Sequence, residues 1–378
     1  MNARERVLAA LNHQQADRVP IHDSPWVATV ERWRKEGLPM VNPAEYFDYE
    51  LVSFTPDTSP RLPIEVVQET EEYIVHRTPY GGLRRDHKDY ATTPEIIDYP
   101  CKSREDWERI KGRLTPSRER VDWEGSWLAG NADDTRGQES VLERGRRDWR
   151  RGLPGCRQAR EQGRFVCYNV MVGYDKLQFY VATEQLLMAI ATEPDWVRDM
   201  YEADANLAIA MYEMMAEGGF QFDGVWLTCD LGYRNGLLFS PRHYDEQLRP
   251  TLRRLFQYFK ARGLPVILHS CGCVRDLIPR FIEDGLTCLQ PLEVKAGMDL
   301  IALKREFGDQ LAFMGGIDVR AMADADPAVI EEEIATKISC AKVGGGYVYH
   351  SDHSVPNNVS LDRYRRVLEL VEKYGAYS

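Results

Sequence analysis

The sequence LHSCGC, at residues 268–273, places a histidine and a cysteine two positions apart at the end of an apolar run. Side chains alternate across a β-strand, so His269 and Cys271 would point the same way and could bind one ion. Imidazole nitrogen and thiolate sulfur together favour zinc. A buried histidine beside a structural cysteine is the alternative for so short a pattern. Cys273, two positions further on, is a weaker candidate ligand.

A second group of polar side chains follows the last apolar run of the chain, in the sequence YVYHSDHSVP at residues 347–356. It contains His350, Asp352 and His353. A third protein ligand from this group would leave the fourth position of a tetrahedral ion open, as in catalytic zinc sites. A surface turn that happens to carry two histidines is the alternative.

The elements that would position these residues are short apolar runs separated by helical stretches. Helices between strands give a parallel sheet, because parallel strands need long crossovers. Eight candidate strands predict a closed (β/α)8 TIM-type barrel. An open doubly wound sheet is the alternative, although the chain has no glycine-rich phosphate-binding motif to support it. The candidate strands are Val19–His22, Leu51–Phe54, Phe165–Val170, Val225–Cys229, Val266–His269, Cys288–Leu292, Leu311–Gly315 and Tyr347–His350.

The helical pattern is clearest after the fourth of these strands. Ser240 and Pro241 predict the start of a helix that runs to Arg262. Residues of about 61–163 break the alternation and predict an insertion after the second strand. Within it, Pro79-Tyr80-Gly81-Gly82 predicts a hairpin over Glu72–Asp86. We expect residues 1–378 to form one barrel domain that carries this insertion.

Barrel enzymes bind substrate at the carboxyl ends of their strands, and several carboxylates lie at those positions here. Asp57, Asp230 and Glu293 are therefore candidates for proton transfer or substrate orientation. Four further residues are candidates for substrate contacts: Tyr174, Trp26, His350 and Asp352. Tyr174 and Trp26 would supply apolar walls, and an ordinary core position is an equally good interpretation of each.

Composition excludes some functions. The 378 residues carry a net charge of −11, which argues against nucleic-acid binding. The one dense basic stretch, residues 144–151, is more typical of a solvated surface. No apolar run approaches the ~20 residues of a membrane span. The first residues fit an amphipathic helix rather than a signal peptide, and the eight scattered cysteines suit a reducing compartment, so we expect a cytoplasmic protein.

Several long segments resemble the uroporphyrinogen decarboxylase superfamily. They are RVLAALNHQQADRVPI at the start, FDGVWLTCDLGYRNGLLFSPRHYDEQLRPTLRRLF in the middle, the three units that follow LHSCGC, and GGGYVYHSDHSVP near the end. The resemblance covers nearly the whole chain outside the insertion. That superfamily includes the decarboxylase of tetrapyrrole synthesis. It also includes methyltransferases that move methyl groups between corrinoid proteins and thiols.

The resemblance is closer to the methyltransferase branch. Decarboxylases of the superfamily carry arginines after the first strand, whereas HDSPWVATVERWR at residues 22–34 has none before Arg32. The methyltransferases carry the H-x-C-G pattern seen at His269–Gly272, and their third ligand, usually a cysteine, corresponds to His353. The resemblance thus implies zinc at His269, Cys271 and His353, with His350 or Asp352 as alternatives for the last.

The function expected from this resemblance is zinc-dependent methyl transfer. The methyl group would move between a donor and a thiol or similar acceptor. The donor would be a small molecule or a corrinoid, and the corrinoid would be bound to a partner protein or used as a substrate. Demethylation of a methoxylated substrate is the same chemistry in the other direction. A metal-independent decarboxylase or lyase that uses Asp57 and His353 is the alternative. A barrel without activity that binds a small ligand or a partner is a third interpretation.

Overall fold

The computed structural model describes residues 1–88, 94–125 and 152–377. The basic stretch at residues 144–151 lies wholly outside this part of the chain. Fifteen α-helices are present in the described residues: α1 Ala3–Leu11, α2 Val27–Lys35, α3 Pro43–Tyr46, α4 Arg104–Lys111, α5 Gly152–Glu161, α6 Gly173–Leu177, α7 Thr183–Thr192, α8 Pro194–Glu217, α9 Pro241–His243, α10 Arg249–Lys260, α11 Ile278–Asp284, α12 Leu300–Phe307, α13 Val319–Ala323, α14 Pro327–Ala341 and α15 Leu361–Gly375. Each of them is too short or too polar to cross a membrane.

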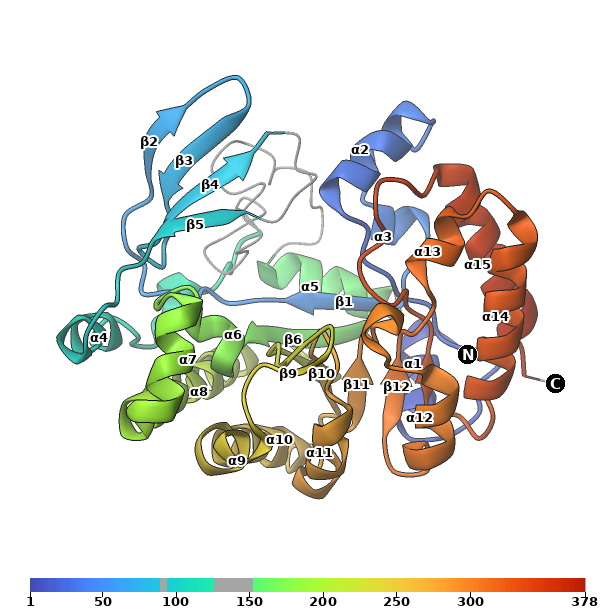
Figure 1. Ribbon diagram of the computed structural model, residues 1–378. Coiled ribbons are helices and arrows are strands. Elements are labelled where there is room, and N and C mark those ends of the chain that lie inside the picture. The colour runs from blue at the N-terminus through green and yellow to red at the C-terminus, as the bar shows by residue number, and fades with distance from the viewer. Residues whose placement is uncertain (89–93, 126–151, 378) are drawn as a thin grey trace.

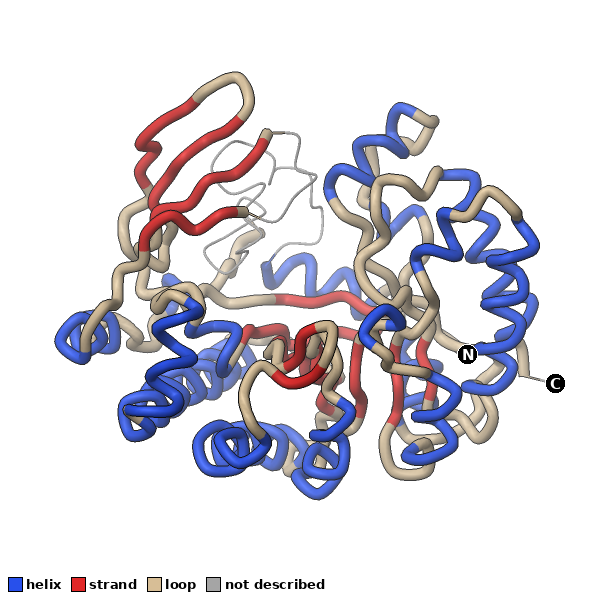
Figure 2. The backbone as a smooth tube through the Cα atoms, in the orientation of Figure 1, coloured by secondary structure: helices blue, strands red, loops and turns tan. Residues whose placement is uncertain are grey.

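A curved sheet of parallel strands forms the centre of the molecule, and the helices lie around its outer side (Figures 1 and 2). Seven of the eight predicted strands are present as strands, with limits within a few residues of those expected. In sheet order they are β1 Leu51–Phe54, β6 Phe165–Met171, β7 Gly224–Thr228, β10 Val266–His269, β11 Cys288–Gln290, β12 Ala312–Met314 and β13 Tyr347–Val348. The predicted mixed α/β fold with a TIM-like parallel sheet is therefore confirmed.

The remaining predicted strand, Val19–His22, is reduced to an isolated parallel bridge between Ile21 and Tyr349. His22 donates its backbone N–H to Tyr349 O at 3.1 Å, and Glu50, just before β1, donates to Ile21 O at 2.9 Å. This segment therefore connects β13 to β1, the two edges of the sheet. An open sheet, the alternative considered above, would leave these edges apart.

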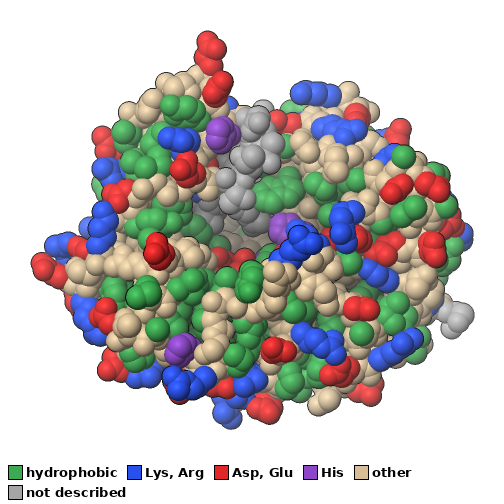
Figure 3. Space-filling model, viewed as in Figure 1, with side chains coloured by type: hydrophobic (Ala, Val, Ile, Leu, Met, Phe, Trp, Pro, Cys, Tyr) green, Lys and Arg blue, Asp and Glu red, His purple; other side chains and the backbone are tan. Residues whose placement is uncertain are grey.

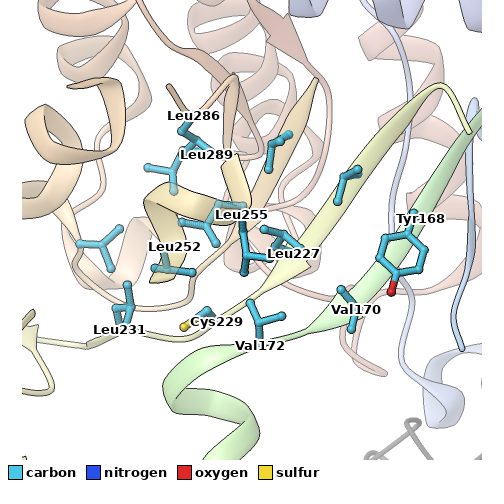
Figure 4. Close-up of a cluster of buried hydrophobic side chains, with 14 of the residues drawn as sticks. Tyr168, Val170, Val172, Leu227, Cys229, Leu231, Leu252, Leu255, Leu286 and Leu289 are labelled. Carbon is cyan, nitrogen blue, oxygen red and sulfur yellow. The ribbon is translucent and has the colours of Figure 1, made fainter. Parts of the chain in front are cut away.

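Two layers of apolar side chains follow from the alternation along the strands. Inward-facing residues such as Cys167, Trp226 and Ile267 pack with Val7 and Leu11 of α1, which covers one end of the sheet's interior. Outward-facing residues pack against the surrounding helices. Figure 4 shows Tyr168, Val170 and Val172 of the β6 region, Leu227 and Cys229 of the β7 region, and Leu252 and Leu255 of α10 in this outer layer.

The helix predicted over residues 241–262 is interrupted. The structure has the short α9, a π-helical turn at Tyr244–Leu248, and then α10. Pro250 lies in the first turn of α10, where its missing N–H needs no partner, whereas inside one long helix it would have broken the ladder. The predicted N-cap is present, since Ser240 accepts a hydrogen bond from His243 N.

A separate antiparallel sheet lies between β1 and β6 in the chain, and it stands apart from the parallel sheet in Figure 1. The predicted hairpin is present in it, because β3 and β4 pair antiparallel with Arg77 opposite Leu83. The limits of the inserted segment, about residues 61 and 163, and the single-domain organisation stay predictions. The four strands are β2 Glu65–Glu69, β3 Tyr73–Arg77, β4 Leu83–His87 and β5 Glu95–Asp98.

Candidate metal centre

Cys271 lies at the centre of a group of donor atoms at the carboxyl end of β10. His269 is the last residue of that strand, and its Nε2 is 3.4 Å from Cys271 Sγ. The two side chains therefore point the same way, as their spacing predicts. Both are partly buried.

Asp230 reaches the same place from the loop after β7, the neighbouring strand. Its Oδ1 accepts a hydrogen bond from the backbone N of Cys271 at 2.8 Å and lies 3.7 Å from His269 Nε2. The donor atoms of these three residues all lie within 4.8 Å of one another.

Glu293 and His353 complete the group from the other side. Glu293 follows β11, and its Oε1 accepts a hydrogen bond from Gly272 N at 3.2 Å. His353 comes from the loop after β13. The donor atoms of Cys271, Glu293 and His353 again lie within 4.8 Å of one another. The described residues thus place five donors in two triplets that share Cys271.

The surroundings of Cys271 favour a positive charge. Burial, followed by the carboxylates of Asp230 and Glu293, raises the pKa of the thiol well above its usual value. A thiolate beside two carboxylates needs a cation, and without one the thiol keeps its proton. Burial lowers the pKa of His353 to about 4, so that its imidazole is neutral and a nitrogen lone pair is available.

This set of donors fits a zinc ion. Thiolate sulfur, imidazole nitrogen and carboxylate oxygen are all zinc ligands, and a divalent charge would offset the negative charges that raise the pKa of Cys271. The predicted ligands His269, Cys271 and His353 are divided between the two triplets. Asp230 and Glu293, expected from the sequence to act on substrate, lie close enough to be ligands as well.

Of the three alternatives for the last ligand, His353 is the one whose donor atom lies in a triplet with that of Cys271 among the described residues. The carboxylate of Asp352 accepts hydrogen bonds from Val294 N and Val319 N, both at 3.1 Å, and so links the loops after β11 and β12. His350 donates from its ring to Ser351 O at 2.7 Å and is 2% exposed.

The other predicted site residues are spread over three places. Trp26 stacks on His353, with ring centroids 6.0 Å apart and planes at 20°, so it borders the cluster. Tyr174 is fully buried in α6, against the ring of Phe239. Burial raises the pKa of Tyr174 to about 12.

Asp57 has partners of its own near the inserted sheet. It accepts hydrogen bonds from Ser59 N and Oγ, at 2.9 and 2.6 Å. Arg61 lies 3.4 Å and Arg120 4.0 Å from its carboxylate. None of these residues belongs to the two triplets, so the structure does not bring Asp57 together with Cys271.

Gln290 is a site residue that the sequence analysis missed. It is the last residue of β11, pairs with His269 in the sheet, and places Oε1 2.5 Å from His269 Nδ1. A polar residue at the end of the apolar run CLQ was the available signal. Its role depends on the register between β10 and β11, which only the structure supplies.

A cation lies near these donors. Lys295 Nζ is 3.6 Å from Glu293 Oε2, and its side chain is half exposed. Figure 3 shows a hollow in this face of the molecule, with hydrophobic side chains and a histidine at its border.

The protein thus combines a mixed α/β fold with a cluster of candidate metal ligands at the strand ends. The chain belongs to the uroporphyrinogen decarboxylase family, whose model matches residues 177–374. No curated protein sequence matches the chain.

Solved structures match the chain as well, and two of them show different degrees of similarity. A methyltransferase from Methanosarcina mazei has a TM-score of 0.63 at 16% sequence identity, and the match covers 99% of each chain. At this identity the similarity establishes the fold. An arabinopyranosidase from Geobacillus stearothermophilus has a TM-score of 0.41 at 9% identity, over 96% of this chain and 78% of its own, which is too low to carry an argument.

Proposed function

We propose that the protein is a zinc-dependent methyltransferase of the uroporphyrinogen decarboxylase family. The observation that carries this proposal is the position of Cys271 between two carboxylates and two imidazoles, in two triplets of donor atoms within 4.8 Å. His269, Cys271 and His353 would hold the ion, with Asp230 or Glu293 close enough to join them. The fold shared with a methyltransferase over 99% of both chains supports the same choice within the family.

A bound zinc ion would lower the pKa of a substrate thiol and so supply a thiolate near neutral pH. Asp230 and Glu293 are placed to accept the proton that the thiol loses. The thiolate sulfur forms a bond to the methyl carbon as the bond between that carbon and the donor breaks, and the donor keeps the electron pair. Trp26, stacked on His353, would form an apolar wall that limits water at the reacting atoms.

The methyl donor or acceptor is proposed to be a corrinoid, bound to a partner protein or free, or a small methylated molecule. This part rests on the resemblance of the sequence to corrinoid-dependent methyltransferases. A cytoplasmic location, with no membrane or nucleic-acid partner, completes the proposal.

A metal-independent lyase is the second candidate, and the surroundings of Asp57 favour it. Its carboxylate lies beside the partly exposed guanidinium group of Arg61, and an arginine is suited to bind a substrate carboxylate. Such an enzyme would work without a metal at Cys271.

Metal analysis of the purified protein, followed by a thiol-dependent methylcobalamin demethylation assay, separates the two candidates. We expect about one equivalent of zinc and activity that chelators remove. Cys271→Ala should lose both zinc and activity while keeping its circular dichroism spectrum. Cys273→Ala is the matched control, since that thiol is also partly buried but outside both triplets, and it should keep both. A Cys271→Ala protein that retains zinc and activity would refute the proposal.

A further inference from the structure

Gln290 lies between two histidines, one inside the candidate metal centre and one outside it. Its side chain is buried, with 2% exposed. Oε1 is 2.5 Å from His269 Nδ1, and Nε2 is 3.5 Å from His350 Nε2. The amide therefore joins the two rings in one line of hydrogen bonds.

The direction of each hydrogen bond in this line follows from groups that can act in only one way. Ser351 O can only accept, so His350 Nδ1, at 2.7 Å, must donate to it. The amide nitrogen of Gln290 can only donate, so His350 Nε2, 3.5 Å away, is the acceptor. The amide oxygen of Gln290 consequently faces His269.

This direction determines the form of His269. An amide oxygen can only accept, so His269 Nδ1 must carry the ring proton. The unprotonated Nε2 then faces Cys271 Sγ at 3.4 Å and Asp230 Oδ1 at 3.7 Å. A metal ligand needs that lone pair on the nitrogen that faces the other donors.

We infer that Gln290 is a positioning residue, which together with His350 holds His269 as the Nδ1–H tautomer with Nε2 ready to bind the metal. The role in metal binding rests on the proposed function, whereas the tautomer itself does not. Partners of this kind are worth about 10–100-fold in metal affinity.

His350, at the far end of this line of hydrogen bonds, is held in the buried region where residues 20–23 meet β13. His350 is 2% exposed and its Nδ1 lies 3.7 Å from Asp23 Oδ1. Asp23 in turn accepts hydrogen bonds from the hydroxyls of Tyr349 and Tyr364 at 3.1 and 3.0 Å. These contacts hold the ring of His350 against rotation and so fix the orientation of the Gln290 amide.

Two substitutions of Gln290 separate positioning from packing. Gln290→Glu keeps an oxygen acceptor for His269 but loses the N–H group that faces His350 and adds a buried charge, whereas Gln290→Met keeps the shape and removes both. We expect Gln290→Met to lower zinc affinity about 10–100-fold, measured by competition with a chelator, and Gln290→Glu to lose clearly less. A packing role predicts the reverse order. Equal losses, or a larger loss in Gln290→Glu, would overturn the inference.

A second measurement uses the unchanged full-length protein and needs no metal. Long-range ¹H–¹⁵N correlation spectra of ¹⁵N-histidine-labelled, zinc-free protein report which ring nitrogen carries the proton. The chain has eight histidines, so the signal of His269 is assigned by its loss in His269→Ala. We expect the Nδ1–H form, and an Nε2–H form would overturn the inference. If His269 carries its proton on Nδ1 but the protein binds no zinc, the inference about Gln290 and His350 stands and only the proposed function is refuted.

Discussion

The carboxylate of Asp230 accepts a hydrogen bond from the backbone N–H of Cys271, and the two atoms are 2.8 Å apart. The bond joins the loop after β7 to the loop after β10. On the next residue, Gly272 N donates to Glu293 in the loop after β11. Consecutive backbone N–H groups of one short turn thus hold both carboxylates of the cluster. The shape of this turn and the position of the donors cannot vary independently.

Gly272 is the residue through which this coupling is most easily tested. Its φ is +78°, and an added Cβ would lie 2.3 Å from the backbone carbon of Gly232 in the β8–β9 hairpin, Gly232–Tyr233 and Gly236–Leu237. Gly297 is a matched control, with φ of +80° and nothing within 4 Å of an added Cβ. We expect Gly297→Ala to cost about 1–2 kcal/mol from the left-handed backbone alone. Gly272→Ala should cost markedly more and should also release zinc.

Urea unfolding of the two variants, together with metal analysis, checks this expectation. Equal losses of stability in the two variants, with zinc retained in Gly272→Ala, would contradict it. The contact between the hairpin and the turn would then have no influence on the donors.

Trp26 should control the pH at which the metal is lost. Burial is the main cause that lowers the pKa of His353 to about 4, and the indole of Trp26 covers that ring. Trp26→Ala exposes the ring, so the pKa of His353 should return toward 6.5 and protons should compete with the metal at a higher pH. Zinc retained after dialysis between pH 4.5 and 7.5 measures the shift. Trp26→Phe, which keeps a ring, should behave like the unchanged protein, and identical curves for all three would show that Trp26 has no such role.

Asp352 should make the metal-free protein less stable as the pH rises. Burial raises the pKa of its carboxyl to about 6 from an ordinary 3.8. The folded state therefore holds this proton more tightly than the unfolded chain, and its contribution to stability is lost as the pH rises from about 4 to 6.

Replacing Asp352 with asparagine removes this penalty. The hydrogen bonds lost with Val294 N or Val319 N give a constant offset, but the stability of Asp352→Asn relative to the unchanged protein should increase between pH 4 and pH 6. Chemical denaturation of both proteins at several pH values measures the difference. A flat or decreasing difference would show that the Asp352 carboxyl ionises as readily in the folded as in the unfolded protein.

Uroporphyrinogen should not be decarboxylated, despite the family to which the chain belongs. The first arginine after the segment at residues 20–22 is Arg32, and it pairs with Glu36 at 2.7 Å and with Asn357 O. It is therefore engaged at the outer end of α2. An assay beside an authentic decarboxylase should give no product above background. Turnover comparable to that enzyme would favour the lyase that uses Asp57.

Most of the fold could be predicted because buried parallel strands are short apolar runs, and runs such as Leu51–Phe54 and Val266–His269 match the structure at both ends. The segment Val19–His22 was harder, because two of its backbone N–H groups donate to residues at the far end of the sequence, Gly375 and Tyr349. The helix over residues 241–262 was predicted without a break because local propensity does not show how Pro250 is accommodated.

The candidate site could likewise be predicted where the local sequence determines it, and not where it depends on long-range contacts. The spacing of His269 and Cys271 predicts their shared direction, and the order of strand ends predicts that His353 faces them. The amide of Gln290 and the backbone contacts of Asp230 depend on register and loop shape, so no pattern in the sequence indicates them. Asp57 lies at a strand end like the others, but its side chain is engaged by Ser59, Arg61 and Arg120.

The contacts between residues 20–23 and the β13 region have a consequence for the order in which the protein folds during synthesis. Asp23 and its partner Tyr349 are 326 positions apart in the chain. A ribosome must therefore release the residues between them before Asp23 and the backbone N–H of His22 can meet their partners near β13. His353 emerges even later. The nascent chain can assemble the earlier units in turn, but the two triplets of donor atoms cannot both form before His353 has left the ribosome.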